Sequence, residues 1–297
     1  MKEVQVFYVD AFTDRPFGGN AAGVVPNADG LTDEEMQHIA REINLSETAF
    51  IFNNSSEQAD FRIRYFTPSS EIDFCGHATV GLSWILATEF DWSNKAKQVL
   101  LETNIGLVPV KWLKKEEGKL SSVVMTQVAP KVKEFTDHLE DISRMVGVDV
   151  ADIDSKYPIK LGYTGNWHLL IPVKSRPAID AAIPKIDDLK EHNQKAGIST
   201  THLFTFDSQD DTCKVYTRDF APAVGIAEDP VTGSANGALA GYFALEEILV
   251  DEHYKIAQGH TMGRPGFLDI FVEKGEEGPV VSVGGKAVRT LSGKMRF

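Results

Sequence analysis

The sequence is poor in cysteine and in positive charge. Only Cys75 and Cys213 occur in 297 residues, which is too few for a disulfide framework, and no CxxC pair offers the usual spacing of a zinc site. Lys and Arg number 30 against 43 Asp and Glu, so the net charge is -13. A charge of this sign repels phosphate backbones and anionic membrane surfaces. We therefore expect neither a nucleic-acid partner nor a membrane partner.

Long apolar stretches are also missing. No run approaches the roughly 18 apolar residues that a membrane span needs. The first residues, MKEVQVFYVDAF, carry Glu3 and Asp10 and alternate like a strand, whereas a secretory signal needs a basic start and an unbroken apolar stretch. These absences, with the scarcity of cysteine, predict a cytoplasmic protein.

A weak internal repeat is present instead. RYFTPSSEIDFC (residues 64–75) aligns without a gap with RDFAPAVGIAED (residues 218–229). Each segment follows a strand-like run and precedes a helix of small apolar residues. A repeat of about half the chain indicates a duplicated domain rather than a solenoid. The alignment places Asp229 opposite Cys75.

The pattern of strands and helices predicts an α+β fold of two similar domains. Strand-like runs surround one long apolar helix in each half, GHATVGLSWILATEF and GSANGALAGYFALEEILV, so we expect each sheet to wrap around its helix. A further helix, LTDEEMQHIAREIN, has Thr32 as its cap and Glu35 three residues later. We expect a first domain of residues 1–125, completed by a strand at about 288–297, and a second of residues 126–287.

Both repeated segments lead from a strand through a proline-containing loop into a helix that starts with glycine and small residues. The first backbone amides of such a helix have no partner within it and lie at its positive dipole end, which suits a carboxylate. Gly76 and His77 would supply one set of amides, and Gly233 and Ser234 the other. The alternative is that these are ordinary helix starts.

Two reactive side chains stand out. Cys75 at a helix start could have a lowered pKa and act as base or nucleophile, but a buried, inert thiol is the commoner role, and a separation of two residues rarely lets a histidine such as His77 serve as its base. Glu47, in NLSETAF, precedes apolar residues, so burial would raise its pKa and let it exchange protons near neutral pH. Alternatively, Ser46 and Glu47 end a helix and face water.

Cofactor signatures are weak. GGNAAG (residues 18–23) lacks the spacing GxGxxG and follows Pro16, which argues against a dinucleotide site. Glu228 and Asp229 have no second carboxylate cluster nearby in the sequence. We expect no metal and no organic cofactor.

Four motifs together resemble the PhzF-like family of phenazine biosynthesis, which is grouped with the diaminopimelate epimerases. They are DAFTDRPFGGNAAGVV, NLSETAF, FTPSSEIDFCGHATVG and RDFAPAVGIAEDPVTGSA, in family order over nearly the whole chain. The resemblance implies two domains, each a mixed sheet around a central helix, an active site in the cleft between them, a homodimer and no cofactor. Ala21 departs from the family, where proline is common, and this change would alter loop stiffness.

The resemblance also assigns roles. It implies that Glu47 is the catalytic glutamate, that His77 and Asp229 are the other catalytic polar residues, and that Gly233 and Ser234 grip the substrate carboxylate. Ser46 and Gly76 would complete the binding residues. In the epimerase relatives, positions like those of Cys75 and Asp229 both hold cysteine, so their two-thiol chemistry should not apply here.

We therefore expect an isomerase that shifts a double bond in a small carboxylate substrate by proton transfer. Two alternatives stay open: a racemase or epimerase with opposed bases, and a small-acid-binding or interaction protein without turnover.

Overall fold

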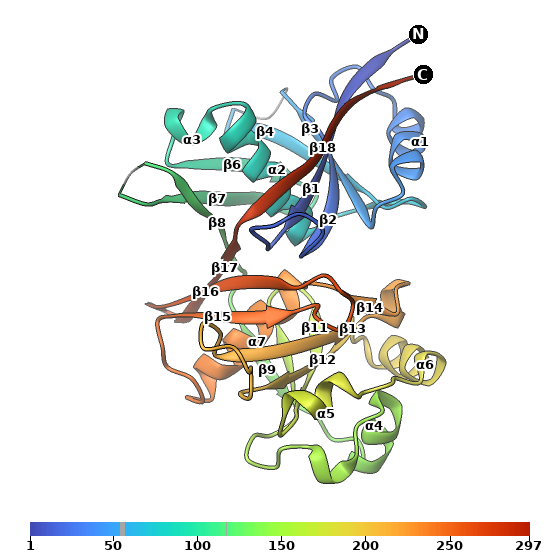
Figure 1. The fold of residues 1–297 in the computed structure, drawn as a ribbon, viewed down its shortest axis with the longest axis vertical. Helices are drawn as coiled ribbons and strands as arrows, with labels where there is room; N and C mark the ends of the chain where they lie inside the picture. The colour runs from blue at the N-terminus through green and yellow to red at the C-terminus, as the bar shows by residue number, and fades with distance from the viewer. Residues whose placement is uncertain (54–56, 117) are drawn as a thin grey trace. The chain divides into compact units, whose positions relative to one another are not determined.

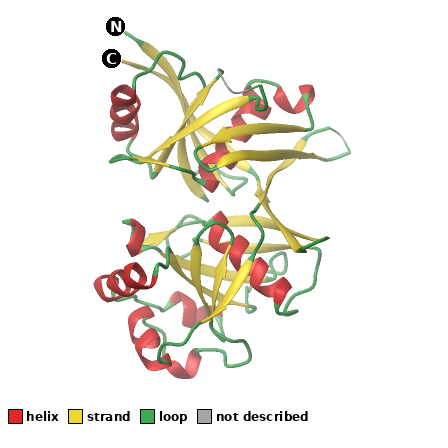
Figure 2. Cartoon of the chain, turned by 180° about the vertical axis from the view of Figure 1, so that it is seen from behind, coloured by secondary structure: helices red, strands yellow, loops and turns green. Residues whose placement is uncertain are grey.

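The computed structural model describes residues 1–53, 57–116 and 118–297. The chain divides into two compact units, Met1–Thr126 with Gly284–Phe297 and Gln127–Val283. Strands form most of the regular structure in each unit (Figure 2), which confirms the α+β class. None of the helices in the described ranges is long and apolar enough to cross a membrane.

The first unit is built around one sheet. Its elements are β1 (Glu3–Ala11), β2 (Asn20–Val25), α1 (Asp33–Ile43), β3 (Glu47–Phe52), β4 (Phe61–Phe66), β5 (Glu71–Ile72), α2 (Gly76–Glu89), α3 (Trp92–Lys95), β6 (Gln98–Thr103), β7 (Gly106–Lys114), β8 (Leu120–Thr126) and β18 (Ala287–Arg296). The strands pair in the order β18-β1-β2-β3-β4-β6-β7-β8, and β5 pairs with β4. Figure 1 shows β18, in red, beside β1, in blue.

The second unit repeats much of this plan. Its elements are β9 (Lys131–Glu134), α4 (Leu139–Val146), a short 3-10 helix (Val150–Asp152), β10 (Lys160–Tyr163), β11 (Trp167–Pro172), α5 (Arg176–Asp180), α6 (Ile186–Ala196), β12 (Thr200–Thr205), β13 (Val215–Phe220), a second 3-10 helix (Pro222–Val224), β14 (Glu228–Asp229), α7 (Gly233–Leu245), β15 (His253–Gln258), β16 (Gly266–Gly275) and β17 (Gly278–Gly285), whose last two residues belong to the first unit. The strands pair in the order β9-β10-β11-β12-β13-β15-β16, and β14 pairs with β13.

Parallel and antiparallel strand pairs alternate in the same order in the two sheets. In the first unit β2 runs parallel to β3 and β4 parallel to β6, while β1-β2, β3-β4 and β6-β7 are antiparallel. In the second, β11-β12 and β13-β15 are parallel, while β10-β11, β12-β13 and β15-β16 are antiparallel. The repeat in the sequence is therefore a repeat of topology.

The gapless alignment fails after the turn that follows β4 and β13. Asp229 pairs with Asp219 on β13, and the first-unit residue in this register position is Ile72, which pairs with Tyr65 on β4. The residue that precedes α7, as Cys75 precedes α2, is Thr232. The prediction that Asp229 is the counterpart of Cys75 is wrong, because the second loop is longer and moves the start of α7.

Each unit has one helix that is buried on nearly all sides, α2 in the first and α7 in the second. Their small residues allow close approach of the surrounding strands, and at Gly241 of α7 an added Cβ would lie 2.3 Å from Pro130 Cβ. The expected central helix of each half is confirmed, although α7 ends at Leu245, before the end of the predicted run. On α1, Thr32 and Glu35 form the predicted reciprocal cap.

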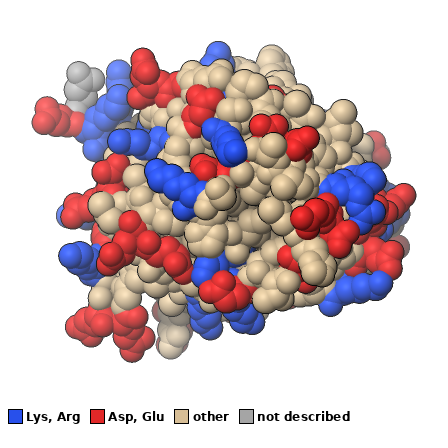
Figure 3. Space-filling view, turned by 90° about the horizontal axis from the view of Figure 1, so that it is seen from below, with Lys and Arg blue, Asp and Glu red and all other residues tan. Residues whose placement is uncertain are grey.

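Charged side chains of both signs share the surface. On the face drawn in Figure 3, basic and acidic groups lie among one another, and within the described residues this face has no continuous basic area.

Candidate functional site

Three of the reactive side chains meet in the first unit. Glu47 is the first residue of β3, Cys75 is the residue before α2, and His77 is the second residue of α2. His77 Nε2 lies 3.1 Å from Glu47 Oε2, and Cys75 Sγ lies 3.4 Å from His77 Nδ1. The separation of two residues, expected to keep Cys75 and His77 out of reach of one another, thus brings them into contact.

The imidazole of His77 is held on both edges. Asn20 Nδ2, at the start of β2, lies 3.2 Å from Nδ1, and Ser46 Oγ lies 3.5 Å from Nε2. The Ser46 hydroxyl donates to the carbonyl oxygen of Ala21 at 3.3 Å, so it can only accept from His77. The ring is therefore fixed in place, with a hydrogen on Nε2.

Glu47 is ionised at neutral pH. Burial raises the pKa of Glu47, but the charge of His77 and hydrogen bonds from its neighbours lower it more, so the pKa is below its ordinary value. The predicted rise in pKa is wrong, because the sequence did not reveal the histidine beside the carboxylate. Oε2 is buried and lies 3.1 Å from His77 Nε2. A carboxylate has about four lone-pair sites, so this contact leaves capacity to accept a proton.

The neighbours of His77 favour its protonated form. Burial alone would lower its pKa, yet Cys75 and Glu47 raise it well above the ordinary value. The side chain is only 9% exposed. The Nε2–H group of His77, held in so dry a place beside a carboxylate, is a strong hydrogen-bond donor to any group that develops negative charge nearby.

Cys75 is a buried thiol. Burial raises its pKa, and Glu47 adds to the rise. A thiolate is therefore scarce at neutral pH. This environment fits a buried, inert thiol better than a base or nucleophile.

The same three residues could in principle hold a metal ion. Among the described residues, ligand atoms of Glu47, Cys75 and His77 all lie within 4.8 Å of one another. Cysteine and histidine must lose protons to bind a metal. The raised pKa values of both groups oppose this at neutral pH.

The remaining predicted residues lie in the second unit. Asp229 ends β14, and its Oδ2 accepts a hydrogen bond of 2.5 Å from the Thr232 hydroxyl. Gly233 and Ser234 begin α7 directly after Thr232. The carbonyl oxygen of Ser234 accepts from the Thr164 hydroxyl at 3.0 Å, which fixes the first turn.

Both helix starts lack a side-chain cap. Neither Cys75 before α2 nor Thr232 before α7 accepts a hydrogen bond from the first turn of its helix. The α1 helix contrasts with them, since Thr32 caps it. Uncapped starts leave backbone donors for a ligand, as an anion site requires.

Sequence reasoning missed two contributors to these groups. Asn20 lies within GGNAAG, which was considered as a nucleotide motif and as part of a family motif, but no role was given to Asn20 itself. Its place at the start of β2 was the overlooked signal. Gly19 before it has a φ of 58°, and an added Cβ would lie 1.9 Å from the carbonyl oxygen of Ala11, so this turn admits only glycine. Thr232 was hidden by the faulty alignment.

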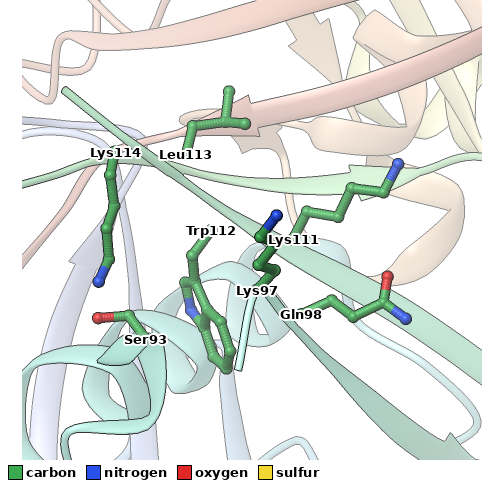
Figure 4. A pocket seen from close by; sticks show the side chains of 7 residues that line it. All are labelled: Ser93, Lys97, Gln98, Lys111, Trp112, Leu113 and Lys114. Carbon is green, nitrogen blue, oxygen red and sulfur yellow. The ribbon is translucent and has the colours of Figure 1, made fainter. Parts of the chain in front are cut away.

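A pocket of about 620 Å³ lies elsewhere in the first unit, beside α3, β6 and β7. Trp112 and the exposed side chains of Lys97, Lys111 and Lys114 are among the residues that line it (Figure 4). None of the predicted site residues lines this pocket, so we assign it no part in the site.

Known proteins resemble the chain over its whole length. A family model described as phenazine biosynthesis-like protein matches residues 9–293. An uncharacterised isomerase of Clostridium acetobutylicum is 35% identical, with 97% of this chain and 96% of that protein covered. The trans-2,3-dihydro-3-hydroxyanthranilate isomerase of Pseudomonas aeruginosa is 31% identical, with 96% and 97% covered.

A solved structure agrees with these relatives. The crystal structure of a Bacillus anthracis phenazine biosynthesis protein of the PhzF family has a TM-score of 0.91 and 34% identity, with 100% of both chains covered. These relatives confirm the expectation that the protein is an isomerase. They do not support the alternative of a binding or interaction protein without turnover. The chain belongs to the phenazine biosynthesis-like protein family and is an isomerase.

Proposed function

We propose that the protein moves a proton within a small carboxylate substrate and so shifts a carbon-carbon double bond, without a cofactor. The observation that carries this proposal is the ionised Glu47, whose buried Oε2 lies 3.1 Å from His77 Nε2. A carboxylate with a free lone pair can take a proton from carbon.

In the proposed reaction, Glu47 removes a proton from one carbon and the electrons of that bond form a new double bond. The original double bond moves, and Glu47 returns the proton to the carbon at its far end. Atoms and charge balance without an oxidant or reductant. The positive charge of His77 stabilises the electron-rich intermediate.

The binding roles are assigned by residue type and position. We propose that the amides at Gly76, His77, Gly233 and Ser234 bind carboxylate or other oxygen groups of the substrate, because both helix starts lack side-chain caps. Ser46 positions His77, and Asp229 orients a polar substituent. Assembly as a homodimer stays a prediction, which light scattering of the purified protein tests directly.

The first substrate to try is trans-2,3-dihydro-3-hydroxyanthranilate, the compound named for the Pseudomonas aeruginosa relative. A panel of related small carboxylic acids should be tried beside it. Proton NMR in deuterated water would follow double-bond migration. Deuterium at a single stereocentre with loss of optical purity would instead indicate a racemase or epimerase.

The decisive variant is Glu47→Gln, which keeps the size of the side chain and removes the base. We expect turnover to fall by about 1000-fold or more, since loss of a general base costs roughly 100- to 10000-fold, while a carboxylate ligand still binds. Glu42→Gln on the exposed face of α1 is the matched control and should behave as the wild type. Full activity of Glu47→Gln would rule out this assignment.

A further inference from the structure

The second unit contains a continuous chain of hydrogen-bonded polar side chains in its interior. We name it the buried relay and define it by eight residues: His168, Thr200, Asp219, His202, Asn236, Gln258, Thr232 and Asp229. Asp219, His202, Asn236 and Gln258 are fully buried, and His168 is 1% exposed. A buried polar group lowers stability unless it forms hydrogen bonds. The presence of so many buried polar side chains in one network therefore needs an explanation.

Backbone groups fix the direction of every hydrogen bond at one end of the relay. Asn236 Nδ2 donates to the carbonyl oxygen of Thr232 at 2.9 Å and to Gln258 Oε1 at 2.7 Å. Gln258 Oε1 also accepts from the Thr232 amide at 3.1 Å, and Gln258 Nε2 donates to the carbonyl oxygen of Asp229 at 2.9 Å. Since a carbonyl only accepts and an amide only donates, neither side chain can be flipped.

The hydroxyl of Thr232 transmits this orientation to Asp229. It accepts from Gln258 Nε2 at 3.2 Å, so its own hydrogen is free to donate. The acceptor is Asp229 Oδ2 at 2.5 Å. The carboxylate of Asp229 is thus held through both its main chain and its side chain.

The same reasoning places a proton on His202. Asn236 Oδ1, 3.2 Å from His202 Nε2, can only accept, so Nε2 carries a hydrogen. Asp219 Oδ1 lies 3.0 Å from Nδ1 and also accepts from the Thr200 hydroxyl at 2.6 Å. His202 therefore directs its Nε2 hydrogen at Asn236 and faces the Asp219 carboxyl group with Nδ1.

The fold does not require this arrangement, because the first unit does without it. At the register positions of His202 and Asp219, the first unit has Ala49 and Tyr65. The same sheet therefore forms around a largely apolar centre. What the second unit has in addition is Asp229, at the end of the relay.

We propose that His202 and Asp219 are positioning residues, which act through Asn236, Gln258 and Thr232 to hold the Asp229 carboxylate and the start of α7 in the geometry that the reaction needs. This inference deepens the proposed function and rests on it for the role of Asp229. A positioned carboxylate need not reorganise during the reaction, which is the advantage of a rigid polar site.

The first experiment needs no substrate. Carbon NMR of labelled aspartate should show that Asp219→Asn and Thr232→Val each shift the side-chain carboxyl signal of Asp229. Asn193→Ala is the matched control, since Asn193 is fully buried in the same unit and bonds Thr201 outside the relay.

The second experiment measures turnover with trans-2,3-dihydro-3-hydroxyanthranilate as the probe. Thr232→Val keeps the shape of the side chain, and we expect kcat to fall about 10- to 100-fold with KM little changed, as for a misplaced catalytic group. Thr232→Ser, which keeps the hydroxyl, should restore most of the loss. Asn193→Ala should lower the melting temperature without lowering kcat.

Two outcomes separate this inference from the proposed function. If Asp219→Asn leaves the Asp229 signal where Asn193→Ala leaves it, the relay is only structural and the inference is overturned. If Asp229→Asn itself retains full turnover, the proposed role of Asp229 is wrong, and the relay has no catalytic group to position.

Discussion

The two units share one strand pattern but bury histidines of opposite character. In the first, His77 sits beside Glu47, and its pKa lies well above the ordinary value. In the second, burial lowers the pKa of His168 to about 4, and its Nε2 is one of the buried side-chain atoms without a hydrogen-bond partner among the described residues. The contrast teaches that the fold does not set the charge of its interior; the neighbouring side chain does.

Two arginines at equivalent positions of the two units differ in how deeply they are buried. Arg64 on β4 and Arg218 on β13 each bind a glutamate with two hydrogen bonds, Glu71 and Glu228 respectively. The Arg64 side chain is 21% exposed, and its third partner is the exposed Asp33. The Arg218 side chain is 8% exposed and donates instead to backbone carbonyls, including those of Ile179 and Ala182.

The largest expected effect comes from removing these arginines. Arg218→Met should destabilise the protein by about 3–5 kcal/mol, because it breaks the ion pair with the half-buried Glu228 and removes the hydrogen bonds to several backbone carbonyls. Arg64→Met should cost about 1–2 kcal/mol. Urea unfolding of both variants measures the difference, and equal losses would show that the two sites are energetically alike.

Changing the pH should act on the two units in opposite directions. His77 binds its proton more tightly in the folded state, so its stabilisation is complete below its ordinary pKa of 6.5 and is lost as the pH rises through the raised value. His168 resists protonation, so the second unit loses stability as the pH falls from 6.5 towards 4, by on the order of 3 kcal/mol.

Hydrogen exchange followed by mass spectrometry reads this effect in each unit separately. His77→Gln should flatten the slope with pH in peptides of the first unit, and His168→Asn should flatten it in peptides of the second. Slopes of the same sign in the two units would contradict the assigned protonation states.

The smallest effect is expected for Tyr65→Phe. Tyr65 occupies the register position of Asp219 and donates to Thr79 Oγ1 at 2.7 Å, while the Thr79 hydroxyl donates to the carbonyl oxygen of Cys75. Loss of one such hydrogen bond should cost about 1 kcal/mol in thermal unfolding and leave turnover intact. A fall in turnover as large as that of Thr232→Val would remove the distinction between the two interiors.

Much of the architecture follows from local patterns in the sequence. The cap formed by Thr32 and Glu35 and the apolar helices near residues 76–89 and 233–245 depend on neighbours in the chain, so their signals are local. The exact offset between the two repeats does not follow from such local signals. Gly233 lies 157 residues after Gly76, whereas Arg218 lies 154 after Arg64, and the extra loop residues that shift the register leave no mark in composition.

Motifs in the sequence name candidate residues for the site but do not reveal their electrostatics. Glu47, His77 and Asp229 were selected by motif, and their roles stay predictions. The direction of the Glu47 pKa depends on a contact between β3 and α2 that no spacing reveals. The buried relay was invisible for the same reason, since His202, Asp219 and Gln258 lie on three different strands and meet only when the sheet forms.

The pairing of β1 with β18 has a consequence for synthesis on the ribosome. The first unit combines residues 1–126 with residues 284–297, so the edge of β1 that pairs with β18 stays unpaired until β18 has been synthesised. Residues 127–283 form a continuous segment that can fold before that moment. A stalled or prematurely terminated chain would therefore expose an open strand edge, and truncating the last ten residues should yield aggregates rather than a smaller, stable enzyme.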